Sequence, residues 1–259
     1  MKLIAVALVL AACQTASEPS APAPAPLPAP HGGVTLRVAT PERIAGSYVI
    51  AGGGGIDFDS ARAGDSLSMH VATTSGHVLI DAKTTTTGYV FSYMDNRLTL
   101  EVSKAWVAQV QAEGDGGPAA QDDSQMHWTG DKNVLDEMLA VPEVASIPLM
   151  SRTLGEMGIT GSEYPASLAL HKIARQSADA LAINVEPLET VSADSAFCTA
   201  YPNQGNDCYG MCGPGCTCWS WVCGDCCYHT GCAKHDDWCR QGKWYYCYNI
   251  TAVIALFGC

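Results

Sequence analysis

The sequence predicts an α+β protein, with an N-terminal antiparallel β-rich region, helices after it, and then a small, disulfide-rich, mainly helical C-terminal module. Three observations carry this prediction. Short β-branched and aromatic stretches with a period of two fill residues 33–110, and from residue 131 the apolar period changes to about 3.6. Twelve of the thirteen cysteines then lie within residues 198–259.

The N-terminus is typical of an export signal. Lys2 precedes ten apolar residues, 3–12, a stretch too short to cross a bilayer as a mature helix. Leu-Ala-Ala-Cys at 10–13 resembles the lipobox of bacterial lipoproteins, in which the cysteine is acylated and the signal is cut before it. We therefore expect a signal peptide at 1–12 and a protein of the bacterial cell envelope that is anchored to a membrane through Cys13. The alternative is an ordinary signal peptide that is cut elsewhere.

Residues 13–32 predict a tether. Six prolines alternate largely with alanine between Pro19 and Pro30, and this stretch carries almost no charge. Such a run builds no core and forms an extended, semi-rigid spacer of about 3 Å per residue. We therefore expect it to hold the folded part of the chain away from the membrane.

The composition argues against nucleic acid as a partner. The formal net charge is −12, whereas phosphate binding needs clustered Lys and Arg. Residues 198–259 hold four of the six tryptophans, Trp219, Trp221, Trp238 and Trp244. These side chains suit contact with lipid, although a small disulfide-rich domain also exposes aromatics simply because its core is small.

The stretches that predict strands are 34–38, 47–50, 67–71, 77–80, 89–93 and 98–102. Turn signals such as Ser75-Gly76 and Thr87-Gly88 separate several of them, so we expect an antiparallel meander or a small sandwich. The four-glycine run 52–55 lacks the lysine of a phosphate loop and predicts a flexible connection between strands. Asp-Phe-Asp at 57–59 lacks the twelve-residue pattern of a calcium loop, so calcium binding there is the weaker interpretation.

Helices are predicted at 131–140, 142–157 and 162–181, after a loop at 111–125. Ser162 can cap the last helix, and Pro165 suits its first turn. Residues 184–197 predict a linker, which divides the chain into a folded region of unknown role at 33–183 and the cysteine-rich module at 198–259. Four histidines stand alone in the sequence and are expected to be ordinary surface or core residues: His70, His77, His127 and His171.

The C-terminal module needs cross-links, because 62 residues bury too little apolar area to offset their chain entropy. Export favours disulfides, each of which stabilises by about 2–4 kcal/mol. The expected disulfide cysteines are Cys198, Cys208, Cys212, Cys216, Cys218, Cys223, Cys226, Cys227, Cys232, Cys239, Cys247 and Cys259. The alternative cofactor is Zn²⁺, because Cys223 and Cys226 have zinc-knuckle spacing with further cysteines and His229 nearby.

One segment of the module predicts chemistry. If residues 224–240 form a helix, Cys232, His235, Asp236 and Cys239 share one face at i, i+3, i+4 and i+7. Cross-links on both sides would hold the His235 ring still, which suits a general base, and a carboxylate beside it suits a hard cation. Upstream, the glycines of the tight loop 213–215 can turn backbone carbonyls inward.

These residues resemble secreted calcium-dependent phospholipase A2. The likeness lies in Tyr-Gly-Met-Cys-Gly-Pro-Gly at 209–215 and Cys-Ala-Lys-His-Asp-Asp-Trp-Cys at 232–239, and it covers about residues 208–240. The resemblance implies that His235 deprotonates water for attack on the sn-2 ester of a phospholipid. It also implies a Ca²⁺ site formed by Asp236 and by the backbone carbonyls of Met211, Gly213 and Gly215, with the metal stabilising the oxyanion.

The sequence departs from the family at the residue that orients the histidine. The family uses a second aspartate from a following helix, and nothing after Asp237 is acidic in this chain. Asp207, Asp225 or a tyrosine of 245–248 would then take that role. A second frame at 226–229 reproduces the paired cysteines but has Thr230 in place of the calcium-binding aspartate. The alternative function is therefore a non-catalytic, cysteine-stapled binding or structural module at the envelope.

Overall fold

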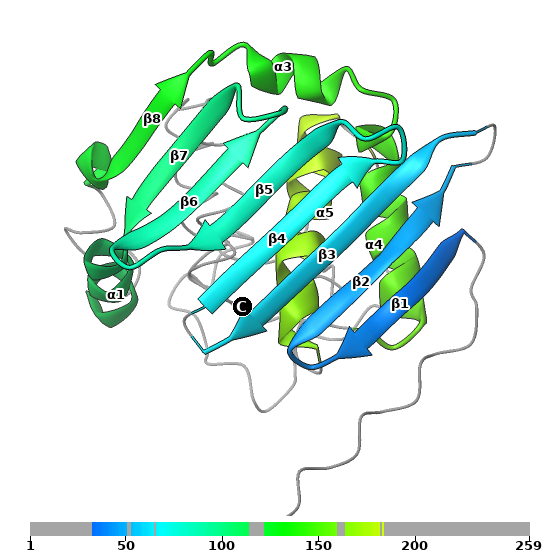
Figure 1. Cartoon of the computed structure of the whole chain (residues 1–259), viewed down its shortest axis with the longest axis horizontal. Coiled ribbons are helices and arrows are strands. Elements are labelled where there is room, and N and C mark those ends of the chain that lie inside the picture. Colours follow the sequence, from blue (N-terminus) through cyan, green and yellow to red (C-terminus); the bar gives the residue numbers. More distant parts are fainter. Residues whose placement is uncertain are drawn as a thin grey trace, which may run out of the picture.

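The computed structural model describes residues 33–50, 53–64, 66–113, 122–159, 164–181 and 183. Within them, eight strands form one antiparallel sheet in which each strand pairs with its neighbours in the sequence (Figure 1). The strands are β1 (Val34–Thr40), β2 (Arg43–Val49), β3 (Gly55–Ala63), β4 (Ser66–Thr73), β5 (Val78–Thr84), β6 (Gly88–Tyr93), β7 (Leu98–Ser103) and β8 (Met126–Gly130).

Short helices accompany the sheet. They are α1 (Lys104–Glu113), α3 (Val134–Leu139), α4 (Ile147–Glu156) and α5 (Leu168–Ala180), with single 3₁₀ turns η1 (Asp123–Gln125), η2 (Val144–Ser146) and η3 (Pro165–Ser167). Figure 1 shows α4 and α5 behind the sheet, where they lie side by side across its strands. No described helix lies on the face that is turned toward the reader.

Alternation along the strands explains why the helices cover only one face. The register aligns one inward-facing residue from each strand from β2 to β8, and this row is Ile44, Ser60, Met69, Ala82, Phe91, Leu100 and Trp128. Most of these side chains are buried and apolar, and they belong to one core together with residues of α4 and α5. A slip of one residue would turn this row to solvent, so burial of this face sets the register.

The helices supply the other half of the core through residues on one side of each. Met150 and Leu154 of α4, and Leu170 and Ile173 of α5, are buried at the spacing of three or four residues that places side chains on one helical face. Pro148 lies in the first turn of α4, where its missing N–H costs nothing. Sheet and helices therefore share one core.

The predicted fold class is wrong. The structure describes one eight-stranded antiparallel sheet with a few short helices, and no mainly helical C-terminal module is found among the described residues. The prediction treated strands and helices as successive regions, but their apolar faces are complementary and pack together. Residues 184–259, which include the predicted linker and the cysteine-rich module, lie outside the described residues, as do the predicted signal and tether of 1–32.

The individual strands and helices agree with the prediction better than the fold class does. Strands β1, β2, β4, β5, β6 and β7 overlap the predicted stretches, and α3, α4 and α5 lie within the predicted helices. Strands β3 and β8 were not predicted, and the strand-like texture assigned up to residue 110 ends earlier, because residues 104–113 form α1. Ser162, the predicted helix cap, lies outside the described residues, and Pro165 begins η3.

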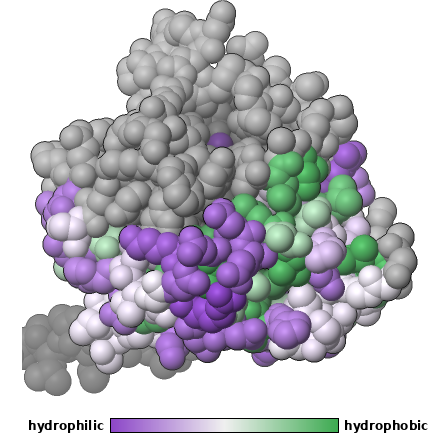
Figure 2. All heavy atoms as spheres, turned by 90° about the horizontal axis from the view of Figure 1, so that it is seen from above, coloured by the Kyte–Doolittle hydropathy of each residue, from purple (hydrophilic) through white to green (hydrophobic). Residues whose placement is uncertain are grey.

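A cluster of ion pairs lies at one end of the sheet. The guanidinium of Arg97, which follows the β6–β7 turn, binds the carboxylates of Glu137 in α3 and of Asp131 just before it. Figure 2 looks onto the molecule from above, the side where α3 lies, and shows hydrophilic residues gathered beside a smaller hydrophobic area. The turn itself is unusual, since Met94, Asp95 and Asn96 all have positive φ, at 46°, 55° and 63°.

Candidate functional site

All the site residues predicted from the sequence lie outside the described residues. They are the lipidation site Cys13, the catalytic His235, the calcium ligands Met211, Gly213, Gly215 and Asp236, and the twelve cysteines of 198–259. These assignments stay predictions. Among the described residues, no group of three or more His, Cys, Asp or Glu side chains is arranged to hold a metal ion. The helices of the described part are all too short or too polar to cross a membrane.

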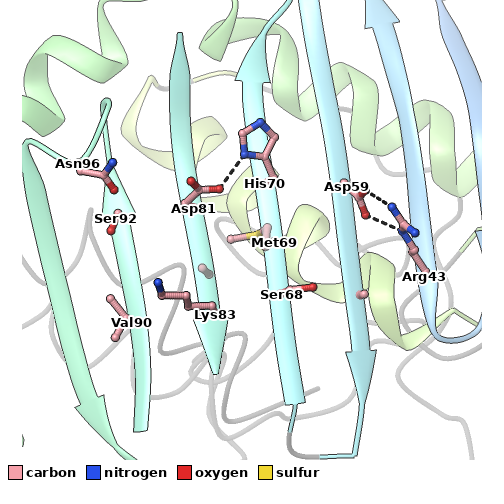
Figure 3. A pocket seen from close by; sticks show the side chains of 12 residues that line it. Arg43, Asp59, Ser68, Met69, His70, Asp81, Lys83, Val90, Ser92 and Asn96 are labelled. Carbon is pink, nitrogen blue, oxygen red and sulfur yellow. Dashed lines mark hydrogen bonds and ion pairs between the residues drawn. The ribbon is translucent and has the colours of Figure 1, made fainter. Parts of the chain in front are cut away.

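The described residues contain a different candidate site, a groove on the open face of the sheet. It has a volume of about 570 Å³ and reaches from β2 to the β6–β7 turn (Figure 3). We call it the open-face groove. Its lining residues are Arg43, Asp59, Ala61, Ser68, Met69, His70, Asp81, Ala82, Lys83, Val90, Ser92 and Asn96.

Strand pairing arranges the groove in two rows across the sheet. One row runs Asp59, His70, Asp81, Ser92, from β3 to β6. The neighbouring row runs Ala61, Ser68, Lys83, Val90 over the same strands. Alternation in each strand points these side chains away from the core, so the burial of the opposite face is what lines them up here.

Arg43 and Asp59 form a two-point ion pair at the β2–β3 side of the groove. Nε of Arg43 donates to Oδ1 of Asp59 at 2.9 Å, and Nη2 donates to Oδ2 at 2.5 Å. The hydrogen bond from Arg43 holds the pKa of the Asp59 carboxyl below its usual value, and the same bond raises the pKa of Arg43. The Arg43 side chain is 52% exposed, so this fork orients both groups more than it stabilises the fold.

His70 and Asp81 pair at the centre of the groove. Nδ1 of His70 lies 2.7 Å from Oδ1 of Asp81, directly across the β4–β5 ladder. A carboxylate only accepts, so this contact places a proton on Nδ1. A neutral ring then offers Nε2 as a hydrogen-bond acceptor. In Figure 3 this second nitrogen points away from Asp81.

Lys83 is the remaining cation of the groove. It lies on β5 opposite Ser68 of β4 and Val90 of β6, and its side chain is exposed. Figure 3 shows its amine and the Asp81 carboxylate standing out from the same face of β5. Neutral hydroxyl and amide groups of Ser68, Ser92 and Asn96 surround these charges. The arrangement can bind a polar ligand through one cation and several neutral donors and acceptors.

Sequence reasoning missed this groove. His70 was interpreted as an isolated histidine, and Asp59 was considered only as a weak calcium ligand, whereas each is paired with a residue of a neighbouring strand. Asp57 also pairs with Arg37, at 3.6 Å, so the calcium interpretation of 57–59 finds no support. The sequence signal that could have revealed the groove is the alternation of polar residues in β3, β4 and β5, which indicates one polar face of the sheet.

The other histidines differ in their surroundings. His77 lies in the exposed β4–β5 turn, where its Nδ1 is 3.5 Å from Oδ2 of Asp95 in the β6–β7 turn. His127 is exposed on β8. His171 is completely buried: Ser151 of α4 donates its hydroxyl to Nδ1, and Nε2–H donates to the carbonyl of Ile159 at 3.1 Å. Burial lowers the pKa of His171 to about 4, so the ring is neutral. His127 is thus a surface residue and His171 a core residue.

Comparison of the whole chain with protein-family models, with curated proteins and with solved structures finds no match.

Proposed function

We propose that this chain is an exported lipoprotein of the bacterial cell envelope, held on a membrane through Cys13, whose segment 198–259 hydrolyses phospholipid esters with the help of Ca²⁺. The observation that supports this proposal is the presence of both Gly213-Pro214-Gly215 and His235-Asp236, two motifs that resemble those of phospholipase A2, although the segment between them is longer than in that family. The anchor and the proline-rich tether fit the same substrate, since they would keep the protein beside a phospholipid surface.

The chemistry follows from the residue types. His235 would take a proton from water, and the water oxygen would add to the ester carbonyl carbon. The carbon–oxygen bond to the glycerol then breaks, and the protonated imidazole returns its proton to the leaving alkoxide, which yields a fatty acid and a lysophospholipid. The donor set of one carboxylate, from Asp236, and three backbone carbonyls contains only oxygen, which suits Ca²⁺. The bound ion supplies positive charge for the oxyanion.

A second candidate function is a non-catalytic binding or structural module at the envelope. The observation that favours it is the absence of any acidic residue after Asp237 in the sequence. A histidine that no neighbouring group orients is a poor general base, because its ring and tautomer are not fixed toward the water.

The hydrolysis assay separates the two candidates. The full chain carrying Cys13→Ser, which cannot be acylated, is mixed with vesicles of several phospholipids, and fatty-acid release is measured with Ca²⁺ or with a chelator. We expect release only with Ca²⁺, and a loss of at least about a hundredfold in His235→Gln, because general-base catalysis contributes at least that much. Asp236→Asn should raise the Ca²⁺ concentration needed for release.

His229→Gln is the matched control for this experiment. It removes an imidazole from the same cysteine-rich segment but not from the motif, and it should retain most of the release. Release that is undetectable, or that ignores both the chelator and His235→Gln, would exclude the hydrolase and leave the non-catalytic module. Loss in both histidine variants together with a lower melting temperature would show a folding defect, and Asp236→Asn then decides through its Ca²⁺ dependence.

A further inference from the structure

The charged and titratable side chains of the open-face groove are not all paired. Arg43 is bound by Asp59, and Asp81 is bound by His70. The side-chain amine of Lys83 makes no ion pair or hydrogen bond with any described residue, although it stands in the middle of the same groove. An anionic group entering the groove therefore has one cation ready to pair with it, and a charge-assisted hydrogen bond is the strongest contact that this site offers.

The rest of the lining suits hydroxyl groups. Ser68 and Val90 flank Lys83 on the two neighbouring strands, and Ser92 lies opposite Asp81. Asn96 reaches the groove from the left-handed turn after β6. Serine and asparagine side chains both donate and accept, which is what a ligand with many hydroxyl groups requires. Ala61 and Val90 provide small apolar surfaces between them, on which the C–H face of a sugar ring can lie.

Other ligand classes fit the groove less well. The large exposed apolar side chains of the described residues, Val49 and Leu149, are not among its lining residues, so the groove offers no surface for an acyl chain. A long polyanion would be repelled by a chain of net charge −12 and would find only one unmatched lysine. The groove crosses four strand spacings from β2 to β6, about 19 Å, which exceeds a single sugar and suits a short chain of them.

We propose that the open-face groove binds a short acidic oligosaccharide, with its carboxylate on Lys83 and its hydroxyl groups on Ser68, Ser92 and Asn96. The Nε2 atom of His70 accepts a hydrogen bond from a further hydroxyl group, and Asp81 holds the His70 ring in place for this contact. The ligand is a glycan and not a phospholipid. The site is therefore independent of the proposed hydrolase and would remain if the hydrolysis assay failed.

Calorimetric titration of the full Cys13→Ser chain tests the proposal with three probes. Two carry a carboxylate from different sources: a trisaccharide of uronic acid, and a disaccharide with a lactyl-ether carboxylate of the kind found in cell-wall glycans. The third is a neutral glucose trisaccharide. We expect at least one acidic probe to bind about tenfold or more tightly than the neutral one, because only the acidic probes gain the ion pair with Lys83. Which of the two binds identifies the source of the carboxylate.

Two substitutions should change the preference for the acidic over the neutral probe in opposite directions. Lys83→Met keeps most of the side-chain stem but removes the charge, and it should weaken the acidic probe about tenfold. Asp81→Asn removes the carboxylate that holds the His70 ring, so it should weaken the neutral probe. It also removes a negative charge two residues from Lys83 on the same strand, so it should raise the preference for the acidic probe over the neutral one. Raising the salt concentration should weaken the acidic probe in the parent chain and have little effect in Lys83→Met.

Lys104→Met is the matched control. Lys104 lies 6.0 Å from the ring of Tyr89, begins α1 and does not line the groove, so its loss should not change the affinity. Thermal unfolding shows whether each variant is folded, and Lys83 is exposed, so its substitution should leave the melting temperature unchanged. The proposal is overturned if neither acidic probe binds, if the neutral probe binds equally well, or if Lys104→Met weakens binding as much as Lys83→Met.

Discussion

His171 shows how strongly one position depends on its surroundings. Its ring lies between α4 and α5, where Ser151 and the Ile159 carbonyl satisfy both nitrogens. Both hydrogen bonds use the neutral tautomer with the proton on Nε2, and burial opposes any second proton. The sequence marks this residue only as a histidine in an apolar helix, and the lowered pKa comes entirely from the packing of two helices.

This burial predicts a pH-dependent stability. The unfolded chain binds a proton at His171 near the ordinary pKa of 6.5, whereas the folded chain does so only near 4. Between these values the unfolded state holds more protons, so the free energy of unfolding is fully retained above pH 6.5 and falls as the pH drops toward 4. The loss is about 3 kcal/mol over that window. Urea unfolding at several pH values measures it.

His171→Gln provides the comparison, because glutamine does not titrate. We expect the variant to be less stable near pH 7, but its stability should change less between pH 6.5 and 4 than that of the parent chain. Carboxylates that titrate in the same range contribute equally to both proteins, so the difference isolates His171. If the free energy of unfolding depended equally on pH in the two proteins, the burial of a neutral His171 ring would be contradicted.

Strand β3 illustrates why an element can be missed in the sequence. Asp57 and Asp59 are residue types that are depleted in strands, and a run of glycines comes before them. The strand forms because Ile56 and Phe58 fill the core between β2 and β4, while the carboxylates are matched by Arg37 and Arg43 on the other face. The glycine run was expected to be a flexible connection. Gly53 and Gly54, at φ of 108° and 80°, do link β2 to β3.

Gly130, at the end of β8, is a position where we expect substitution to destabilise the fold. Its φ is +110°, and an added Cβ would stand 2.2 Å from the carbonyl oxygen of Arg97, the residue just before β7. Gly130→Ala therefore combines backbone strain with a clash against backbone that cannot yield cheaply. We expect the free energy of unfolding to fall by more than about 3 kcal/mol, measured by urea unfolding.

Gly76→Ala separates the effect of backbone strain from that of the steric clash. Gly76 also has a positive φ, +94°, but nothing lies within 4 Å of the position that its Cβ would take. The strain alone should cost about 1–3 kcal/mol. If both substitutions cost the same, the close approach of Gly130 to the Arg97 carbonyl is not what makes a glycine necessary there.

Considered as a whole, the described chain is one sheet that shares a single core with its helices. The sheet is a meander, so every pairing joins neighbours in the sequence. Short turns such as 41–42 and 94–97 join several of the strands, whereas α1 and η1 lie between β7 and β8. Its helix-covered face is built from apolar residues of both layers, and its open face is left to polar side chains. The molecule therefore presents the open-face groove on a rigid, hydrogen-bonded surface, which favours a binding site with preset geometry.

The cysteine content predicts a measurable property of the full chain. If the twelve cysteines of 198–259 form disulfides, the purified Cys13→Ser chain should show no free thiols when it is denatured without reductant. If they bind zinc instead, a thiol reagent will find many free thiols, and metal analysis of the native protein will find bound Zn²⁺. The two results exclude one another for any given cysteine, because a thiolate ligand is not oxidised.

Local patterns predicted what depends on near neighbours in the chain. The period of two marked most strands, the period of 3.6 marked α4 and α5, and short motifs indicated an exported, lipid-anchored chain with a candidate hydrolase segment. These signals are readable because side-chain direction repeats along an element whatever that element packs against.

Only the tertiary structure decided which residues meet. Arg43 binds Asp59 sixteen positions away, His70 binds Asp81 eleven positions away, and Ser151 binds His171 twenty positions away. Each contact depends on strand register or on helix packing, and these are set by the burial of a shared apolar face and not by the polar residues themselves. That is why the open-face groove emerged from the fold, while the sequence had pointed to the cysteine-rich segment alone.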